Sequence, residues 1–160
     1  MQVGFYHLTL SSLERALPRL LEKMVAAGHR VVVLTGSEER LKSLDHACWT
    51  YTPLSFLPHA TPLDGLKPED QPIWITTQPE RPNGASVLVL TDGMEVQDLS
   101  PYNRCVVMQE GDAPETVASI KAFSNRLKAQ QIPVIHWTQT QTGWVQGVVA
   151  NPAIQEASLA

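Results

Sequence analysis

The segment RVVVLTGSE, residues 30–38, sets the class of fold that we expect for this 160-residue chain. Its first half is an apolar, largely β-branched run without alternation, which is typical of a strand covered on both faces in a parallel sheet. Residues 35–38 then supply a turn and a capping signal for a helix that runs to about Trp49. A strand followed at once by a helix predicts an α/β architecture.

The same alternation extends in both directions from this segment. Ser11 and Asp112 are placed to cap two further helices, one running to about residue 27 and one after residue 112. Strands are expected at residues 3–8, 30–34, 73–76, 86–90, 104–108 and 134–137. The pattern predicts one α/β domain over residues 1–150, with a mostly parallel, Rossmann-like sheet flanked by helices, and a flexible tail at residues 151–160.

One part of this topology stays open at the level of sequence. The strands expected at 73–76 and 86–90 are separated only by a short polar segment, so they could pair with each other instead of joining the parallel arrangement.

Composition limits the classes of function. The net charge of -4 and the pI of about 5.7 argue against a protein whose main role is the direct binding of phosphates. Cys48 and Cys105 provide neither a disulfide framework nor a zinc site, and we expect no catalytic residue, no metal and no cofactor. The N-terminus has no charged leader and no segment approaches the ~18 apolar residues of a membrane span, so we expect a cytoplasmic protein that contacts no membrane.

An enzymatic alternative rests on Thr35-Gly36-Ser37, which lies where a doubly wound protein would bind phosphate. One glycine matches neither of the glycine-rich phosphate-binding motifs, and most turns of this kind are structural. A small nucleotide-binding or hydrolytic α/β enzyme is therefore the alternative interpretation.

Residues 43–62, SLDHACWTYTPLSFLPHATP, carry large apolar side chains between prolines that exclude a regular helix or a central strand. The second part of this stretch belongs to a connection from residue 51 to residue 72, which is long for a compact domain. Tryptophan, phenylalanine and proline are typical of protein-binding hot spots. Trp49 and Phe56 are therefore candidates for a partner interface, unless they fold back under the sheet with Leu57 as a satellite core.

The last expected helix carries a local group of cations on an acidic chain, namely Lys121, Arg126 and Lys128. Lys121 and Lys128 are seven residues apart and so share a helix face. The plain interpretation is a solvated helix surface. The functional one is a shallow site for an acidic peptide that ends in an aromatic residue and a free carboxylate.

Residues 30–59 resemble the chi subunit family of bacterial DNA polymerase III. The similarity consists of the apolar strand, an acidic helix start, Leu44, Asp45 and Trp49, and then the segment Ser55-Phe56-Leu57-Pro58-His59. Residues 72–93 and the N-terminal VGFYHL are also similar to the family.

The resemblance implies a non-catalytic accessory subunit of the polymerase III holoenzyme, in its clamp-loader complex. Such a subunit holds the acidic C-terminal tail of single-stranded DNA-binding protein, binds a psi subunit where one exists, and contacts DNA only indirectly. The resemblance places the partner interface at Trp49, Leu54, Phe56, Leu57 and Pro58. It places the tail site at Lys121, Arg126, Lys128, Val117 and Phe123.

Overall fold

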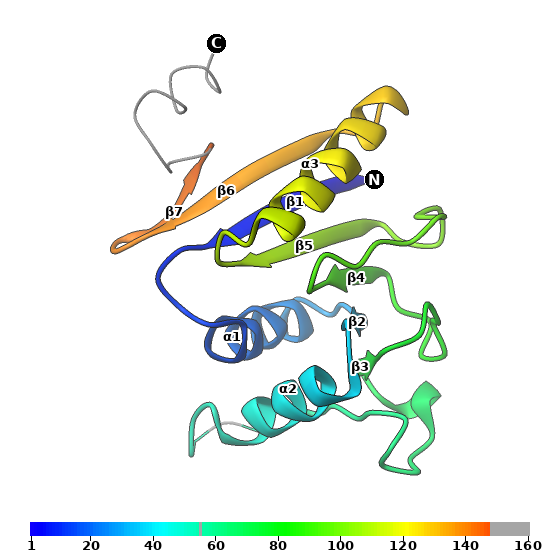
Figure 1. Cartoon of the computed structure of the whole chain (residues 1–160). Coiled ribbons are helices and arrows are strands. Elements are labelled where there is room, and N and C mark those ends of the chain that lie inside the picture. The colour runs from blue at the N-terminus through cyan, green and yellow to red at the C-terminus, as the bar shows by residue number, and fades with distance from the viewer. Residues whose placement is uncertain (55, 148–160) are drawn as a thin grey trace.

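The computed structural model describes residues 1–54 and 56–147, and in this part of the chain seven strands form one sheet in the order β3-β2-β4-β5-β1-β6-β7 (Figure 1). The strands are β1 (Gln2–Leu8), β2 (Val31–Leu34), β3 (Ile73–Thr76), β4 (Val87–Leu90), β5 (Arg104–Glu110), β6 (Val134–Thr140) and β7 (Gly143–Gln146). Every neighbouring pair is parallel except β6 and β7. The expected mostly parallel α/β sheet is confirmed, whereas the tail expected at 151–160 lies outside the described residues.

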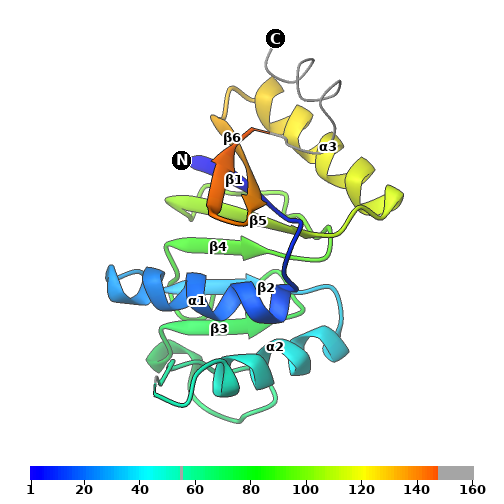
Figure 2. The same ribbon diagram turned by 90° about the vertical axis from the view of Figure 1, so that its left-hand side faces the viewer.

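Three α-helices and a short 3-10 helix accompany the sheet within the described residues: α1 (Leu13–Ala26), α2 (Glu38–Thr50), α3 (Pro114–Ala129) and η1 (Pro68–Asp70). Helices α1 and α2 lie side by side over one face; in Figure 2 α1 lies in front of β2, and α2 lies below β3. Helix α3 buries its apolar side on the other face, against β1 and β5. The sheet thus separates two cores, and its two faces offer two different surfaces.

The strands β3 and β4 do not pair with each other, which settles the open part of the topology. Each pairs in parallel with β2, one on either side. All four residues of β2 are buried, as its unbroken apolar run indicates. The connections from β3 to β4 and from β4 to β5 contain no described helix, and they cover the second face with Ala85, Leu99 and Tyr102.

Two expected helix caps are wrong, and in both cases a tertiary partner takes the side chain. Ser12, not Ser11, accepts the capping hydrogen bond at the start of α1, because the Ser11 hydroxyl accepts one from Gln139 Nε2 at 2.6 Å. Ala113 stands at the N-cap of α3 without a side-chain cap, while Asp112 pairs with His7 at 3.0 Å. Strand β7, which is not among the expected strands, forms a hairpin with β6.

Candidate functional site

The turn at Thr35-Gly36-Ser37 holds one of the chain's own carboxylates. The Gly36 backbone N–H donates to Asp92 Oδ2 at 3.0 Å, and the Ser37 hydroxyl accepts from the Arg40 N–H as the cap of α2. A Cβ at position 36 would lie 2.8 Å from the Cβ of Asp92, so this close approach accounts for the glycine. The position at which a nucleotide phosphate would bind is therefore occupied by an anion.

Arg40 joins three carboxylates in the same crevice. Its guanidinium donates to Glu14, Asp92 and Glu110, and these four side chains are between 22% and 36% exposed. Burial acts to lower the pKa of Arg40, but the three carboxylates outweigh it and the net pKa is raised. The crevice at the carboxyl ends of the strands is thus filled by an ion-pair cluster that ties α1, α2, β5 and the turn after β4 together.

A groove of about 430 Å³ runs between α3 and the adjoining strands β1 and β6, and we call it the α3 groove. Val117, Lys121 and Lys128 all line it, so three of the five residues expected for a tail site come together. Both lysines are exposed, and Val117 is 41% exposed. The remaining lining residues are Phe5, Tyr6, His7, Gln109, Asp112, Ile120, Ser124, Asn125, His136, Trp137 and Thr138.

The floor of the α3 groove is aromatic and largely uncharged. Phe5 stacks on His136 with ring centroids 4.9 Å apart, and Ser124 Oγ lies 3.3 Å from His136 Nε2. Burial lowers the pKa of His136, and the nearby Lys128 lowers it further. At neutral pH the ring is therefore uncharged and extends the apolar floor between the two lysines.

The other two expected tail-site residues, Arg126 and Phe123, face a different part of the molecule. Arg126 pairs with Glu95 at 3.0 Å and lies over the Phe123 ring at 5.0 Å from its centroid. Phe123 is 3% exposed and packs against Phe5 in the core. Both side chains line a separate hollow beside residues 96–102, so the described structure does not bring them to the α3 groove.

A carboxylate stands at the rim of the α3 groove. Asp112 lines it and pairs with His7 Nε2 at 3.0 Å, and the same ring nitrogen lies 3.1 Å from the Gly111 carbonyl oxygen. The Asp112 side chain is 79% exposed. It places negative charge near the two lysines and would oppose an anionic ligand.

The expected partner interface divides into exposed and buried members. Trp49, Leu54 and Phe56 are 56%, 95% and 72% exposed, and the Trp49 and Phe56 rings lie 5.9 Å apart. We call these three residues the aromatic patch. Leu57 is only 3% exposed and belongs to the core with α1 and α2, while Pro58 is half-buried. The satellite-core interpretation therefore holds for Leu57 but not for Trp49 or Phe56.

His59 fastens this segment to α2. Its side chain is fully buried, and both ring nitrogens have an acceptor: the Leu57 carbonyl at 2.7 Å and Asp45 Oδ1 at 2.9 Å. The Trp49 ring packs against it with centroids 4.9 Å apart. Asp45 and His59 thus hold the backbone beneath the aromatic patch.

These surfaces belong to a small α/β protein with one mostly parallel sheet. Among the described residues no three His, Cys, Asp or Glu side chains gather as a metal site, and no helix is long and apolar enough to cross a membrane. Both cysteines are buried, and burial raises the pKa of each thiol to about 12, with a contribution from Asp45 at Cys48.

Comparison with known proteins gives the family. The family model described as DNA polymerase III chi subunit, HolC, matches residues 1–134, and the chain belongs to this family of replication accessory subunits. A relative from Rickettsia prowazekii (strain Madrid E), described as a probable DNA polymerase III subunit chi, is 29% identical over 149 residues. That alignment covers 89% of this chain and 88% of the relative.

Proposed function

We propose that this protein is a cytoplasmic, non-catalytic subunit that binds the acidic C-terminal tail of single-stranded DNA-binding protein in the α3 groove. Through the aromatic patch it binds psi or another clamp-loader component, and so connects the coated DNA strand to the clamp loader. The observation that carries the proposal is the pairing of Lys121 and Lys128 at the rim of an apolar groove on an otherwise acidic chain.

The α3 groove suits an acidic peptide that ends in phenylalanine. Lys121 and Lys128 offer ammonium donors to side-chain carboxylates and to the terminal carboxylate, in charge-assisted hydrogen bonds. The terminal ring would lie on the floor formed by Phe5 and Ile120. Because both lysines are exposed, the affinity should fall as salt is added.

The aromatic patch suits a protein partner. Three large apolar side chains exposed together are costly in water unless a partner covers them, and aromatic residues dominate the energetics of interfaces. The buried contacts of His59 reduce the ordering that the segment would undergo on binding. We propose Trp49, Leu54 and Phe56 as the contacting residues, with Leu57 and Pro58 supporting them from beneath.

The enzymatic alternative is disfavoured by the Asp92 carboxylate at the Gly36 N–H. A phosphate there would have to displace an anion that is also held by Arg40 at 3.0 Å. No other observation at this turn favours a nucleotide site.

A matched pair of variants tests the tail site. Replacing both Lys121 and Lys128 by alanine should weaken binding of a fluorescent tail peptide about tenfold or more in an anisotropy titration, since two charge-assisted contacts are lost. Arg126→Ala, on the same helix but outside the α3 groove, should leave the affinity nearly unchanged. Equal losses in both variants, with each protein folded, would contradict the assignment.

The partner site has its own control. Leu54→Ala should reduce capture of psi or the clamp loader, whereas Leu63→Ala, an exposed leucine outside the patch, should not. If the Leu54→Ala and Phe56→Ala variants both captured psi or the clamp loader as well as the wild type, the aromatic patch would not be the partner site.

A further inference from the structure

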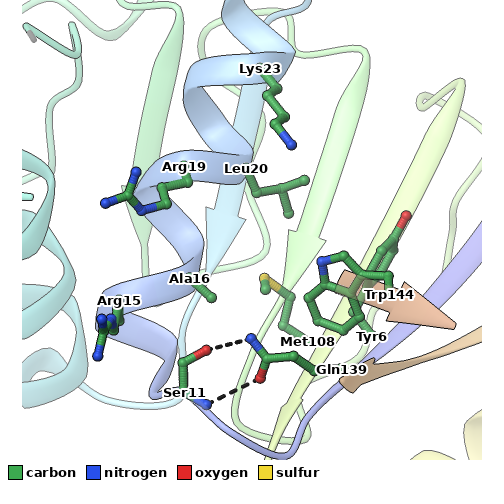
Figure 3. Close-up of a pocket in the computed structure, with 10 residues that line it drawn as sticks. All are labelled: Tyr6, Ser11, Arg15, Ala16, Arg19, Leu20, Lys23, Met108, Gln139 and Trp144. Carbon is green, nitrogen blue, oxygen red and sulfur yellow. Dashed lines mark hydrogen bonds between the residues drawn. The ribbon is translucent and has the colours of Figure 1, made fainter. Parts of the chain in front are cut away.

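A second groove lies on the opposite face of the sheet from α3, between α1 and the β6–β7 hairpin (Figure 3). It has a volume of about 320 Å³ and we call it the α1 groove. The functions proposed above make no use of it. Its lining comes from α1, from strands β1 and β5, and from the hairpin: Tyr6, Ser11, Arg15, Ala16, Arg19, Leu20, Lys23, Met108, Gln139 and Trp144.

The charge of the α1 groove is entirely positive. Arg15, Arg19 and Lys23 are exposed and follow one another at intervals of four residues, which is a rise of about 6 Å along the helix between neighbours. In Figure 3 the Lys23 amine points toward the groove, whereas the Arg15 and Arg19 guanidinium groups lie on the other side of α1 from Trp144. Within the described residues none of the three cations forms an ion pair, and the lining contains no Asp or Glu.

The wall of the groove opposite α1 is aromatic. Trp144 is 38% exposed and meets the Tyr6 ring edge to face, with centroids 5.2 Å apart and an angle of 85°. Tyr6 in turn stacks with Trp137 at 6.2 Å. Ala16, Leu20 and Met108 complete an apolar floor. A flat ligand can therefore stack on an indole while its charge remains at the cationic rim.

The uncharged polar side chains of Gln139, Ser11 and Tyr6 in the α1 groove already have partners. Gln139 Oε1 accepts from the backbone N–H groups of Leu10 at 3.0 Å and Ser11 at 3.1 Å, and its amide nitrogen donates to the Ser11 hydroxyl. The Tyr6 hydroxyl accepts from Arg104 at 3.2 Å. A peptide would find few partners for its backbone amides here. What the groove offers a ligand is positive charge and aromatic surface.

We propose that the α1 groove binds single-stranded nucleic acid without sequence preference. The backbone passes over α1, with one phosphate near Lys23 at the groove and others near Arg19 and Arg15 on the far side of the helix, and a base stacks on Trp144. Proteins that bind single-stranded nucleic acid without sequence preference combine cations along the backbone with aromatic side chains on which the bases stack. This site goes beyond the proposed tail-binding role and replaces the expectation that DNA is contacted only indirectly. Because the two grooves lie on opposite faces of the sheet, one molecule can hold the strand and a tail peptide together.

The test is an anisotropy titration of fluorescein-labelled oligothymidylate at low salt with the full chain. Trp144→Ala should weaken binding about 5- to 100-fold through the lost stacking, while Trp49→Ala, an exposed tryptophan elsewhere, should have no effect. Charge reversal by Arg19→Glu should also weaken binding, and Lys42→Glu on α2 should not. Three phosphate contacts give a slope of log K against log salt of about -2.

Three results would overturn the proposal. The first is no binding of the oligonucleotide by the folded protein at low salt. The second is evidence that the contact lies elsewhere, given either by equal loss in the Trp144→Ala and Trp49→Ala variants or by a loss on replacing Lys121 and Lys128. The third is displacement of the oligonucleotide by an acidic peptide that fails to bind the Arg19→Glu variant, because the α1 groove would then be a peptide site.

Discussion

Replacement of Arg40 by methionine tests whether the crevice at the strand ends is structural. The change keeps most of the side-chain stem and removes the guanidinium that binds Glu14, Asp92 and Glu110. A pair exposed to water contributes up to about 1 kcal/mol, and breaking a fully buried pair costs about 3–5 kcal/mol. The Arg40 side chain is 22% exposed and has three partners, so we expect a loss of about 2–3 kcal/mol in the free energy of unfolding.

For a chain of this length that loss corresponds to a fall in Tm of about 4–12 °C. Urea unfolding and a thermal scan at pH 7 would measure both quantities for the wild type and the variant. Arg15→Met is the matched control, since Arg15 forms no ion pair among the described residues.

The same variant has an expected pH dependence. Burial acts to raise the pKa of Glu14, but hydrogen bonds from its own backbone N–H, Arg40 and Ser43 outweigh it and the pKa is lowered below 4.5. A carboxylate with a lowered pKa stabilises the fold above its ordinary pKa, and this contribution is lost as the pH falls through the folded value. The difference between wild type and variant should therefore shrink below about pH 4.5. A variant as stable as the wild type, or more stable, would refute the reasoning and point to a ligand site in the crevice.

Three further predictions concern the α3 groove and the segment after α2. Asp112→Asn should raise tail-peptide affinity about two- to fivefold at low salt, because it removes an anion from the groove rim, and titrations in high salt should abolish the gain. Tail affinity should fall as the pH is lowered through the pKa of His136, which burial and then Lys128 hold below 6.5, because a protonated ring would put a charge in the apolar floor on which the terminal ring lies; a His136→Gln variant that keeps the full fall would contradict this. Asp45→Ala should cost about 1–3 kcal/mol in urea unfolding and speed proteolysis near residues 50–58, with tail affinity unchanged as the control.

Much of the sheet could be predicted because its strands are continuous apolar runs. Residues 31–34, 73–76 and 87–90 are buried throughout, and a short unbroken apolar run of this kind is typical of parallel strands covered on both faces. The hairpin strand β7 has no such signal. Its residues are exposed, and its pairing with β6 depends on a tertiary arrangement that local pattern does not encode.

The candidate sites show the same division. Helical spacing alone correctly joins Lys121 to Lys128, and it also separates Arg126, which lies five residues from Lys121 and so faces another direction. The floor residues Phe5 and His136 could not be found in this way, because they are 131 residues apart in sequence and become neighbours only through the pairing of β1 with β6. Burial of Leu57 beside exposed Phe56 likewise depends on how His59 turns the segment.

The most direct test is a titration of the wild-type protein with a peptide that copies the acidic, phenylalanine-ending C-terminus of single-stranded DNA-binding protein. The same peptide without its last residue is the control. We predict micromolar binding of the complete peptide, weakened by salt, and little binding of the shortened one, because the ring and the terminal carboxylate are the groups that the α3 groove accommodates. Equal binding of the two peptides, or binding of neither by the folded protein, would contradict the proposed function.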